Sequence, residues 1–436
     1  MNGAYIYDID ESPPRDESTN SYEYHKFYPT QNSDLNNYSA IRIVINAKDQ
    51  LYHLHEGYLE VKGKVVQKAD SAEFPTKSGI ALIHNAFPYM FRNFTYKMNG
   101  QIIESVDYPG HVSSLLHDAI FSSSKPYEGG LQFLWFPDRD TTATSVNKGW
   151  EIRRNMLIEE PDKNGSFVIK IPLNMIYGFA EYVKVVTHVN HEFEMTRQAD
   201  YFSLFRGDDI AGINAATAEG KIDITSLVLW APLVEADGEV KLNLKEAELS
   251  GKDEYVIAFR QRRGIMAEVT TGVTNWTWSF STINYNERPQ YLLLGFQKGF
   301  GEDQKSNYAL FENMGVQSMF CVVNNQQIPY VITDADFKNL DFGTFYTDLQ
   351  NFRSNYLQID PLISESGINP LRFKNLCTIY AFDLTKHERD IRGDVVNSRI
   401  EVKFSKETEA NTKAYACIIS EKEIFLKSDG SNMVIR

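Results

Sequence analysis

Histidine and acidic side chains that could bind a metal ion occur at two places in the sequence. His53 and His55 are separated by one residue, so both imidazoles could lie on one face of a strand, and His188, His191 and Glu192 form a looser cluster. Neither group has a cysteine or a further carboxylate at a spacing typical of a metal site. His188 and Glu192 would share one face of an alternating strand, which favours a solvated surface. We therefore assign no metal ion and no cofactor to this sequence.

Paired carboxylates could catalyse glycoside hydrolysis, and adjacent acidic residues occur at Glu159-Glu160 and at Asp208-Asp209. A chain with 58 acidic residues is expected to contain such pairs by chance. The sequence has no phosphate-binding Gly-x-x-x-x-Gly-Lys-Ser/Thr loop, no Gly-x-Gly-x-x-Gly motif and no Gly-x-Ser-x-Gly nucleophile motif. We therefore assign no catalytic residue and expect the protein not to be an enzyme.

Two other motifs point to binding rather than to catalysis. The basic cluster Arg260-Gln261-Arg262-Arg263 could contact nucleic acid or an acidic neighbour, or it could donate structural or intersubunit salt bridges, which we favour. Arg-Gly-Asp occurs at residues 206–208 and 392–394. Each tripeptide is either a receptor-binding loop or an ordinary turn with glycine at its centre, and the turn is the simpler interpretation.

Length and composition limit the class of protein. The chain has 436 residues, which predicts two or three domains, and 42% of the residues are hydrophobic, as in a folded globular protein. The 44 basic and 58 acidic residues give a net charge of −14, which disfavours a sequence-reading DNA-binding protein. We expect Cys321, Cys377 and Cys417 to be buried free thiols in a reducing compartment, and no apolar run is long enough to span a membrane.

Alternation of apolar and polar residues predicts strands through most of the chain. The clearest cases are residues 41–45, 59–65, 167–171, 241–245 and 400–404. Asn99-Gly100 lies between two such runs and predicts a tight hairpin, because both central residues of that turn need a positive φ. Helices are few: residues 111–121 carry an apolar stripe, and residues 337–352 form a weaker candidate that contains Gly343.

The two halves of the sequence repeat the same order of elements. In each half an apolar strand reaches Asn99-Gly100 or Asn324-Asn325, and a second strand and a short helix follow. This repetition predicts an all-β fold of two tandem eight-stranded jelly-roll β-sandwiches, a double jelly roll, with short helices in its loops. We place an N-terminal arm at residues 1–35, which is either a mobile arm or a frayed end. The first jelly roll then takes residues 36–206, a linker 207–219 and the second jelly roll 220–436.

Several longer segments resemble one known family. They are Ile83 to Gly100 (Ile-His-Asn-Ala-Phe-Pro-Tyr-Met-Phe-Arg-Asn-Phe-Thr-Tyr-Lys-Met-Asn-Gly), Asp107 to His111, Phe167 to Phe179, His191 to Met195, Leu204 to Arg206, Arg288 to Gln297, Ala410 to Ala416 and Lys427 to Gly430. Together they are similar, in collinear order over nearly all of residues 36–436, to double jelly-roll major capsid proteins. The most similar group is that of the Polinton (Maverick) elements and adintoviruses. The N-terminal arm is outside the resemblance.

This resemblance implies a structural protein of a virion. In that family two jelly rolls stand side by side in one subunit, three subunits form a pseudo-hexameric capsomer, and capsomers tile an icosahedral shell around double-stranded DNA. It further implies a single jelly-roll penton protein as a partner, synthesis in the host cytoplasm and assembly in the nucleus. Local contacts with packaged DNA could use the Arg260 cluster or the N-terminal arm.

Two other functions remain open from the residues alone. One is a β-sandwich carbohydrate-binding module of a mobile element, which would need an exposed cluster of aromatic side chains with polar partners. The other is a glycoside hydrolase, which would need two carboxylates about 5–10 Å apart in a cleft.

Overall fold

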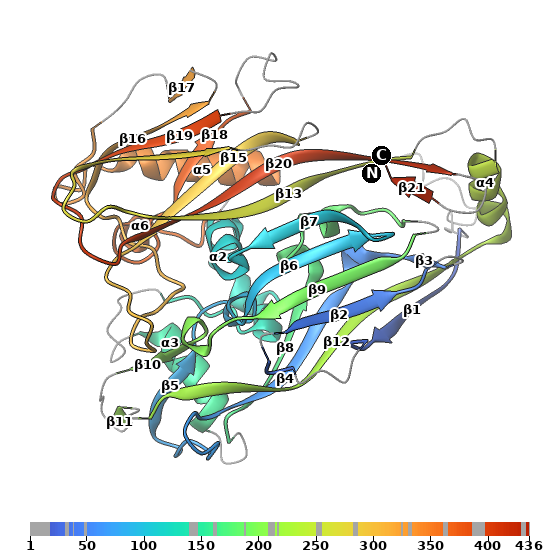
Figure 1. The fold of residues 1–436 in the computed structure, drawn as a ribbon, viewed down its shortest axis with the longest axis horizontal. Coiled ribbons are helices and arrows are strands. Elements are labelled where there is room, and N and C mark those ends of the chain that lie inside the picture. Colours follow the sequence, from blue (N-terminus) through green and yellow to red (C-terminus); the bar gives the residue numbers. More distant parts are fainter. Residues whose placement is uncertain are drawn as a thin grey trace, which may run out of the picture.

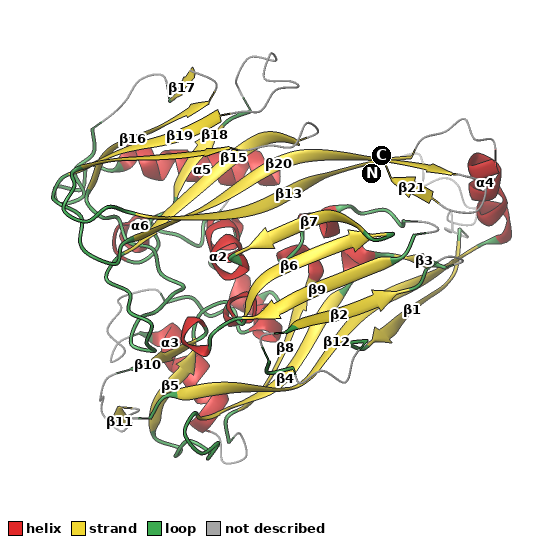
Figure 2. Ribbon diagram, viewed as in Figure 1, coloured by secondary structure: helices red, strands yellow, loops and turns green. Residues whose placement is uncertain are grey.

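The computed structural model describes sixteen segments of the chain. They are residues 18–30, 35–37, 39–47, 50–138, 147–159, 164–186, 189–207, 214–215, 218–249, 255–281, 287–323, 326–329, 334–360, 365–385, 397–428 and 433–435. These segments form two β-barrels that lie side by side, each built from two facing antiparallel sheets (Figure 1). Helices are short and lie at the ends of the barrels and between them (Figure 2).

The first barrel contains sheets that we call 1A and 1B. Sheet 1A has the strand order β1-β12-β4-β8, and sheet 1B has the order β2-β9-β6-β7. The bounds in sheet 1A are β1 Thr19–Phe27, β12 Gly220–Ala236, β4 Tyr58–Gln67 and β8 Ser166–Pro172, with the short β3 Leu51–Tyr52 also paired to β12. The bounds in sheet 1B are β2 Ala40–Ile45, β9 His191–Arg197, β6 Phe91–Met98 and β7 Gln101–Asp107.

The second barrel contains the corresponding sheets 2A and 2B. Sheet 2A has the order β13-β20-β15-β18, and sheet 2B has the order β14-β19-β16-β17. The bounds in sheet 2A are β13 Tyr255–Glu268, β20 Lys413–Ser428, β15 Glu287–Gln297 and β18 Tyr380–Asp383, with β21 Met433–Ile435 also paired to β20. The bounds in sheet 2B are β14 Asn275–Ser281, β19 Asn397–Phe404, β16 Val316–Val323 and β17 Gln326–Ile328.

The two barrels have the same topology. When the strands of the two barrels are matched in chain order, the strand order of sheet 1A becomes that of sheet 2A, and that of 1B becomes that of 2B. The matched pairs are β1 and β13, β2 and β14, β4 and β15, β6 and β16, β7 and β17, β8 and β18, β9 and β19, and β12 and β20. Eight strands in two four-stranded sheets with this order are a jelly roll. The predicted fold class, two tandem jelly rolls, is therefore confirmed.

The remaining elements connect the strands. The helices are α1 Ala86–Tyr89, α2 Pro109–Ile120, α3 Lys148–Arg154, α4 Gly238–Leu249, α5 Gly343–Leu357 and α6 Pro370–Asn375. Single helical turns are η2 Leu54–Glu56, η3 Lys125–Tyr127, η4 Gly130–Phe133, η5 Asn155–Glu159, η6 Leu173–Met175, η7 Gly178–Glu181 and η8 Asp200–Phe202. A small sheet joins β10 Leu204–Arg206, β5 Ser78–Leu82 and β11 Asn214–Ala215.

Most of the elements predicted from periodicity are confirmed. Strands β2, β4, β8 and β19 lie where apolar and polar residues alternate, and α2 covers the predicted helix. In the β6–β7 hairpin Asn99 has φ 47° and Gly100 has φ 81°, the positive values that the Asn-Gly pair predicts. The second helix begins at Gly343, so this glycine does not interrupt it. Asn324-Asn325 lie outside the described residues.

The strand predicted at residues 241–245 is wrong, because these residues belong to α4. Leu, Glu, Lys and Ala dominate this segment, and these residue types favour a helix. The Asp237 carboxylate accepts a hydrogen bond from the backbone N–H of Glu239 at 3.1 Å, at the start of the helix. Leu242 is 62% exposed, so the five-residue alternation does not mark a buried face.

Strand pairing differs from the sequence-based boundaries in two places. β1 lies in the expected N-terminal arm, yet it pairs with β12 in sheet 1A. β12 was expected to open the second jelly roll, yet it pairs with β4 and is the last strand of the first barrel. The reason is burial, because Ile222, Ile224 and Leu229 of β12 pack in the first core. The sheets therefore favour a first unit of residues 19–236; residues 1–17 and 208–213 lie outside the described residues.

The hydrophobic cores of the two barrels exchange residues. Leu115, Leu116 and Ala119 of α2, a helix of the first half, pack in the core cluster of the second barrel. Conversely, Ile257 and Phe259 of β13 pack in the cluster of the first barrel. Each barrel thus buries apolar side chains that the other barrel supplies, which predicts that neither core is complete alone.

We predict that Gly264→Ala destabilises the protein by about 2 kcal/mol, because a methyl group there overpacks the contact between the barrels. Gly264 lies on β13, and a Cβ atom would be 1.9 Å from the carbonyl oxygen of Asp107. Gly238→Ala is the matched control, because no atom lies within 4 Å of its Cβ position. Urea unfolding of both variants measures the difference, and equal stability of the two would contradict the close approach.

Candidate functional site at the barrel interface

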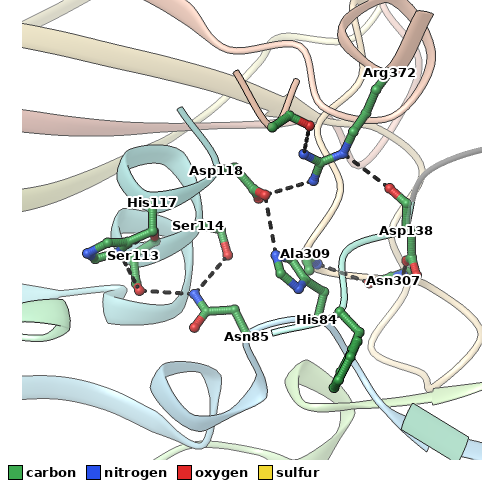
Figure 3. Close-up of polar contacts among 12 residues, drawn as sticks. His84, Asn85, Ser113, Ser114, His117, Asp118, Asp138, Asn307, Ala309 and Arg372 are labelled. Carbon is green, nitrogen blue, oxygen red and sulfur yellow. Dashed lines mark hydrogen bonds and ion pairs between the residues drawn. The ribbon is translucent and has the colours of Figure 1, made fainter. Parts of the chain in front are cut away.

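The helix α2 enters the boundary between the barrels and carries a buried carboxylate. Asp118 is 2% exposed, and its Oδ1 accepts hydrogen bonds from Arg372 Nη2 at 2.7 Å and from His84 Nε2 at 3.3 Å (Figure 3). Arg372 lies on α6 of the second barrel and is 3% exposed. An ion pair between the two halves of the chain is therefore enclosed by protein on all sides.

Asp138 connects this network to Asn307 and Arg372 (Figure 3) and also to Arg153 of α3. Its backbone carbonyl accepts a hydrogen bond from Arg372 Nε at 3.1 Å, and its carboxylate accepts from Arg153 Nη2 at 2.9 Å and from Asn307 Nδ2 at 2.6 Å. Asp138 and Arg153 belong to the first half of the chain, whereas Asn307 and Arg372 belong to the second. The network therefore ties the loops of both barrels to α2.

A second buried carboxylate, Glu104 of β7, joins the barrels at another part of the interface. Glu104 is fully buried and accepts hydrogen bonds from the backbone N–H groups of Gly178, Phe179 and Arg262 at 2.8–3.0 Å. Gly178 and Phe179 belong to η7 of the first barrel, and Arg262 belongs to β13 of the second. A Cβ on Gly178 would lie 1.9 Å from the carbonyl oxygen of Arg260, so this approach of the two backbones requires glycine.

Glu181 pairs with both arginines of β13. Arg262 Nη2 contacts Glu181 Oε1, and Arg260 Nε lies 3.2 Å from Glu181 Oε2. The Tyr356 hydroxyl donates to Glu181 Oε1 at 2.7 Å, and the Arg260 guanidinium lies 3.8 Å from the centre of the Tyr356 ring. A charged cluster of η7, β13 and α5 therefore crosses the interface.

Neutral polar groups also pair between the barrels. His111 of α2 stacks on Tyr415 of β20 with ring centres 3.6 Å apart, and its Nε2 donates to Gln297 Oε1 at 3.3 Å. The side chain of Gln304 exchanges two hydrogen bonds with the backbone of Gly220, at 2.6 and 2.8 Å. These contacts satisfy polar groups that burial would otherwise leave unpaired.

Burial and charge together set the protonation of the interface carboxylates. Burial alone would raise the pKa of Asp118, but Arg372 and His84 hold it below its usual range. Burial likewise opposes ionisation of Glu181, and Arg262 and Arg260 hold its pKa below the ordinary value. Glu104 differs: burial raises its pKa, although the three backbone N–H groups and Arg262 oppose the shift. At neutral pH the pairs of Asp118 and Glu181 are thus ionic.

The arrangement is suited to holding two domains together. The charged groups at the centre of the interface are buried and paired, so they stabilise only the arrangement in which both barrels are present. Shifting one barrel against the other would leave Asp118 or Arg372 without its partner. The interface therefore makes the relative position of the barrels specific.

The histidines considered for metal binding have other partners. The rings of His53 and His55 stack 5.8 Å apart; His53 Nε2 donates to the Val183 carbonyl at 3.0 Å, and His55 Nδ1 to the Ala180 carbonyl at 2.8 Å. Both residues lie in or beside η2 and not on a strand face. Among the residues that the structure describes, no three His, Cys, Asp or Glu side chains are grouped to hold a metal ion.

The looser cluster is divided between the core and the surface. His191 is fully buried, and its Nδ1 lies 2.7 Å from the Tyr96 hydroxyl. Glu192 faces outward and pairs with Lys97 at 3.0 Å and with Arg42 at 3.0 Å. His188 lies outside the described residues.

The Arg260 cluster is used inside the subunit. Arg260 and Arg262 pair with Glu181, which agrees with the structural salt bridges favoured from the sequence. Arg262 is 1% exposed, so the alternative of a nucleic-acid contact is corrected for this side chain.

The other candidate motifs lie largely outside the described residues. The residues outside are Glu160, Asp208-Asp209 and the whole of the second Arg-Gly-Asp, residues 392–394. Of the first Arg-Gly-Asp, Arg206 is the last residue of β10. The three cysteines are buried and unbonded, as predicted, and burial raises the pKa of the Cys321 and Cys417 thiols to about 12.

Sequence reasoning did not identify Glu104, Asp118, Glu181 or Arg372 as interface residues. Asp118 had one signal, because it lies in a short helix whose other residues are apolar, small or histidine. All twelve residues of that helix are buried, which no amphipathic surface helix would show. Glu104 and Arg372 carry no comparable signal, because each lies in an ordinary polar context.

The fold and its interface define a protein in which two jelly rolls are joined into one subunit. A model of the double jelly roll-like domain matches residues 80–424. The chain therefore belongs to the double jelly roll-like domain family. No curated protein sequence matches it.

Solved structures with the same fold come from several viruses. A chain in the structure of the Sputnik virophage has a TM-score of 0.61 and 10% identity, with 100% of this chain and 92% of that chain covered. The mavirus major capsid protein has a TM-score of 0.55 and 11% identity, with 100% and 95% covered. The Faustovirus major capsid protein has a TM-score of 0.54 and 10% identity, with 97% and 92% covered.

The helices of the described segments are too short or too polar to cross a membrane.

We predict that Asp118→Asn lowers the free energy of unfolding by about 3–5 kcal/mol, because it leaves the Arg372 charge buried without a counter-charge. Glu409→Gln is the control, because Glu409 is exposed and pairs with Lys298 at 3.4 Å and Lys406 at 3.5 Å. Such surface pairs contribute at most about 1 kcal/mol. Urea unfolding would contradict the assignment if the two variants lost equal stability.

We predict that stability falls as pH is lowered from about 6.5 toward 3. Burial lowers the pKa of His111, His117 and His191 to about 3, so in this range the unfolded chain binds protons that the folded chain does not. Each histidine contributes up to about 1.4 kcal/mol per pH unit. Urea unfolding at several pH values measures the slope, and His191→Gln should reduce it by one histidine's share. An unchanged free energy between pH 7 and 4.5 is the contrary result.

Proposed function

We propose that this protein is a major capsid protein of the Polinton (Maverick)/adintovirus-like group. Three copies would form a pseudo-hexameric capsomer, and capsomers would tile an icosahedral shell around double-stranded DNA. The observation that carries the proposal is the pair of jelly rolls with identical strand order, joined by buried ion pairs into one subunit. Three such subunits place six similar units around one axis.

The comparisons support this proposal at the level of the fold. Two of the solved structures, those of mavirus and Faustovirus, are of major capsid proteins, and both cover more than nine-tenths of this chain. The residues that resemble the Polinton and adintovirus proteins support the narrower group. A structural, non-enzymatic role fits an interface at which Glu104, Asp118 and Arg372 are buried and hydrogen-bonded.

The proposal includes partners and a location. The partners are further copies of this chain and a single jelly-roll penton protein, and the location is the virion after synthesis in the host cytoplasm and assembly in the nucleus. The net charge of −14 fits a shell wall that does not neutralise the DNA it encloses. Because Arg260 and Arg262 pair with Glu181, any local contact with DNA would use other basic residues.

We predict that the purified protein forms trimers of about 150 kDa, three chains of 50.0 kDa each. Size-exclusion chromatography with light scattering measures the mass, and negative-stain microscopy should show particles of hexagonal outline or whole shells. A monomer of 50.0 kDa at every salt concentration and pH tested would refute the proposal.

A further inference from the structure

Three buried histidines lie around α2, where one barrel meets the other. His111 and His117 belong to α2, and His84 contacts Asp118 of the same helix (Figure 3). Each of the three side chains is almost fully enclosed by protein. The helix itself packs against β13, β15 and β20 of the second barrel as well as against β6 and β7 of the first. A change in the charge of these rings would therefore act on the contact between the barrels.

Each of these imidazoles fits its site in the neutral form. His111 Nε2 donates to Gln297 Oε1 at 3.3 Å, and the Gln297 amide nitrogen donates to two backbone carbonyls, so its oxygen faces the ring. His117 Nδ1 donates to the Ser113 carbonyl at 2.8 Å. His84 Nδ1 is buried and has no hydrogen-bond partner among the described residues. A neutral ring needs only one acceptor, whereas a second proton on His84 would be buried without one.

Cations surround His84. Arg153 of α3 and Arg372 of α6 both oppose its protonation, and Asp118 is the anion that favours it. Asp118 already pairs with Arg372 at 2.7 Å, so it is not a free counter-charge for an imidazolium. Burial is the largest effect, and together with the two arginines it lowers the pKa of His84 from its ordinary value.

The two rings of α2 face further cations. Burial, with Lys413 of β20, lowers the pKa of His111 to about 3. Burial, with Arg262 of β13 and Lys125 of η3, lowers the pKa of His117 to about 3, although Asp118 opposes that shift. Protonation of either ring would therefore add a positive charge next to positive charges, in a place that water does not reach.

The other elements at this interface do not supply a free anion among the described residues. They bring a cation, two tyrosines and two carboxylates: Arg353 of α5, Tyr89 of α1, Tyr415 of β20, Glu104 of β7 and Glu181 of η7. Burial raises the pKa of both tyrosines, so they stay neutral. Both carboxylates already contact Arg262.

We propose that α2 is an acid-sensitive element of the barrel interface: in mild acid His84, His111 and His117 take up protons, and the interface opens while the sheets of each barrel remain folded. A ring that reaches water regains a pKa near its ordinary value of about 6.5, so the open form binds protons that the closed form does not. The stability of the closed interface is thus complete above pH 6.5 and falls as the pH is lowered.

The size of the effect follows from the same linkage. Between pH 7 and pH 5, each of His111 and His117 multiplies the equilibrium constant for opening by about 20. A shell built from such subunits would loosen in an acidic compartment. The inference goes beyond the proposed function and does not depend on it, because the interface lies within one chain.

The three cysteines can report on the opening. Asp118 raises the pKa of the buried Cys377 thiol, and Glu104 raises that of Cys417, so these two thiols lie close to interface carboxylates. Cys321 is 1% exposed on β16 of sheet 2B, inside the second barrel. Opening of the interface should therefore expose Cys377 and Cys417, whereas only unfolding of the barrel exposes Cys321.

The test measures thiol labelling of the full chain by mass spectrometry. The reagent is a dipyridyl disulfide, which still reacts with thiols in acid, and each rate is divided by that of the urea-unfolded chain at the same pH. From pH 7 to pH 5 we expect labelling of Cys377 and Cys417 to rise more than about 100-fold, and far above that of Cys321. No rise, or an equal rise at all three cysteines, would overturn the inference.

Two variants test whether the interface histidines cause the rise. His117→Gln keeps a neutral side chain that can donate a hydrogen bond, and it should reduce the rise about 20-fold. His191→Gln is the matched control, because His191 is fully buried but contacts Tyr96 within the first barrel. It should leave the rise at Cys377 and Cys417 unchanged. Equal effects of the two substitutions would contradict the assignment to α2.

A second measurement uses wild type alone and covers the case in which His117→Gln does not fold. Amide hydrogen exchange, corrected for the intrinsic rate at each pH, compares α2 with β9. Protection of α2 should fall more than about 100-fold from pH 7 to pH 5, and protection of β9 should fall much less. An equal fall in the two elements would mean that acid unfolds the whole chain, and the inference would be wrong.

Discussion

Asp118 and Arg372 carry opposite charges that neither barrel could bury alone, and their contact fixes the position of one jelly roll against the other. Each is almost fully enclosed by protein, and their atoms are 2.7 Å apart. A buried pair adds little to stability when compared with apolar side chains, but losing one partner is costly. The pair therefore acts mainly as a specificity device. It penalises any arrangement in which the barrels separate or shift, and the exchange of apolar residues between the cores supplies the attraction.

The two barrels have the same topology, but their equivalent elements are not equally buried within the subunit. The same strand order occurs twice, yet the helices that follow the equivalent strands β7 and β17 have different surroundings: every residue of α2 is buried, whereas α5 is partly exposed.

Sequence periodicity predicted the elements whose structure depends on local pattern alone. β2, β4, β8 and β19, the Asn99-Gly100 turn and α2 follow from local pattern, and so does the repetition of the two halves. Sheet membership did not follow, because pairing partners are distant in sequence. β12 begins 153 residues after the last residue of β4 yet pairs with that strand. The sheet pairing therefore places β12 in the first barrel, whereas the sequence-based boundary placed it in the second. Residues 238–249 show the converse, where helix propensity prevailed over a five-residue alternation.

The interface itself could not be predicted from sequence, because its members are ordinary residues in ordinary contexts. Glu104 in a strand and Arg372 in a short helix acquire their role only through contacts with the other barrel in the folded chain. The resemblance to a family supplied the number and arrangement of the jelly rolls, but not the residues that join them. Those residues come from the distances and the burial in the folded chain.

Differential scanning calorimetry tests most directly the claim that this interface makes two jelly rolls one unit. We predict a single unfolding transition for the wild-type chain, in which both barrels of the 436-residue chain unfold together. Two resolved transitions, each with the enthalpy of one barrel, would show that the barrels fold independently and would contradict the account.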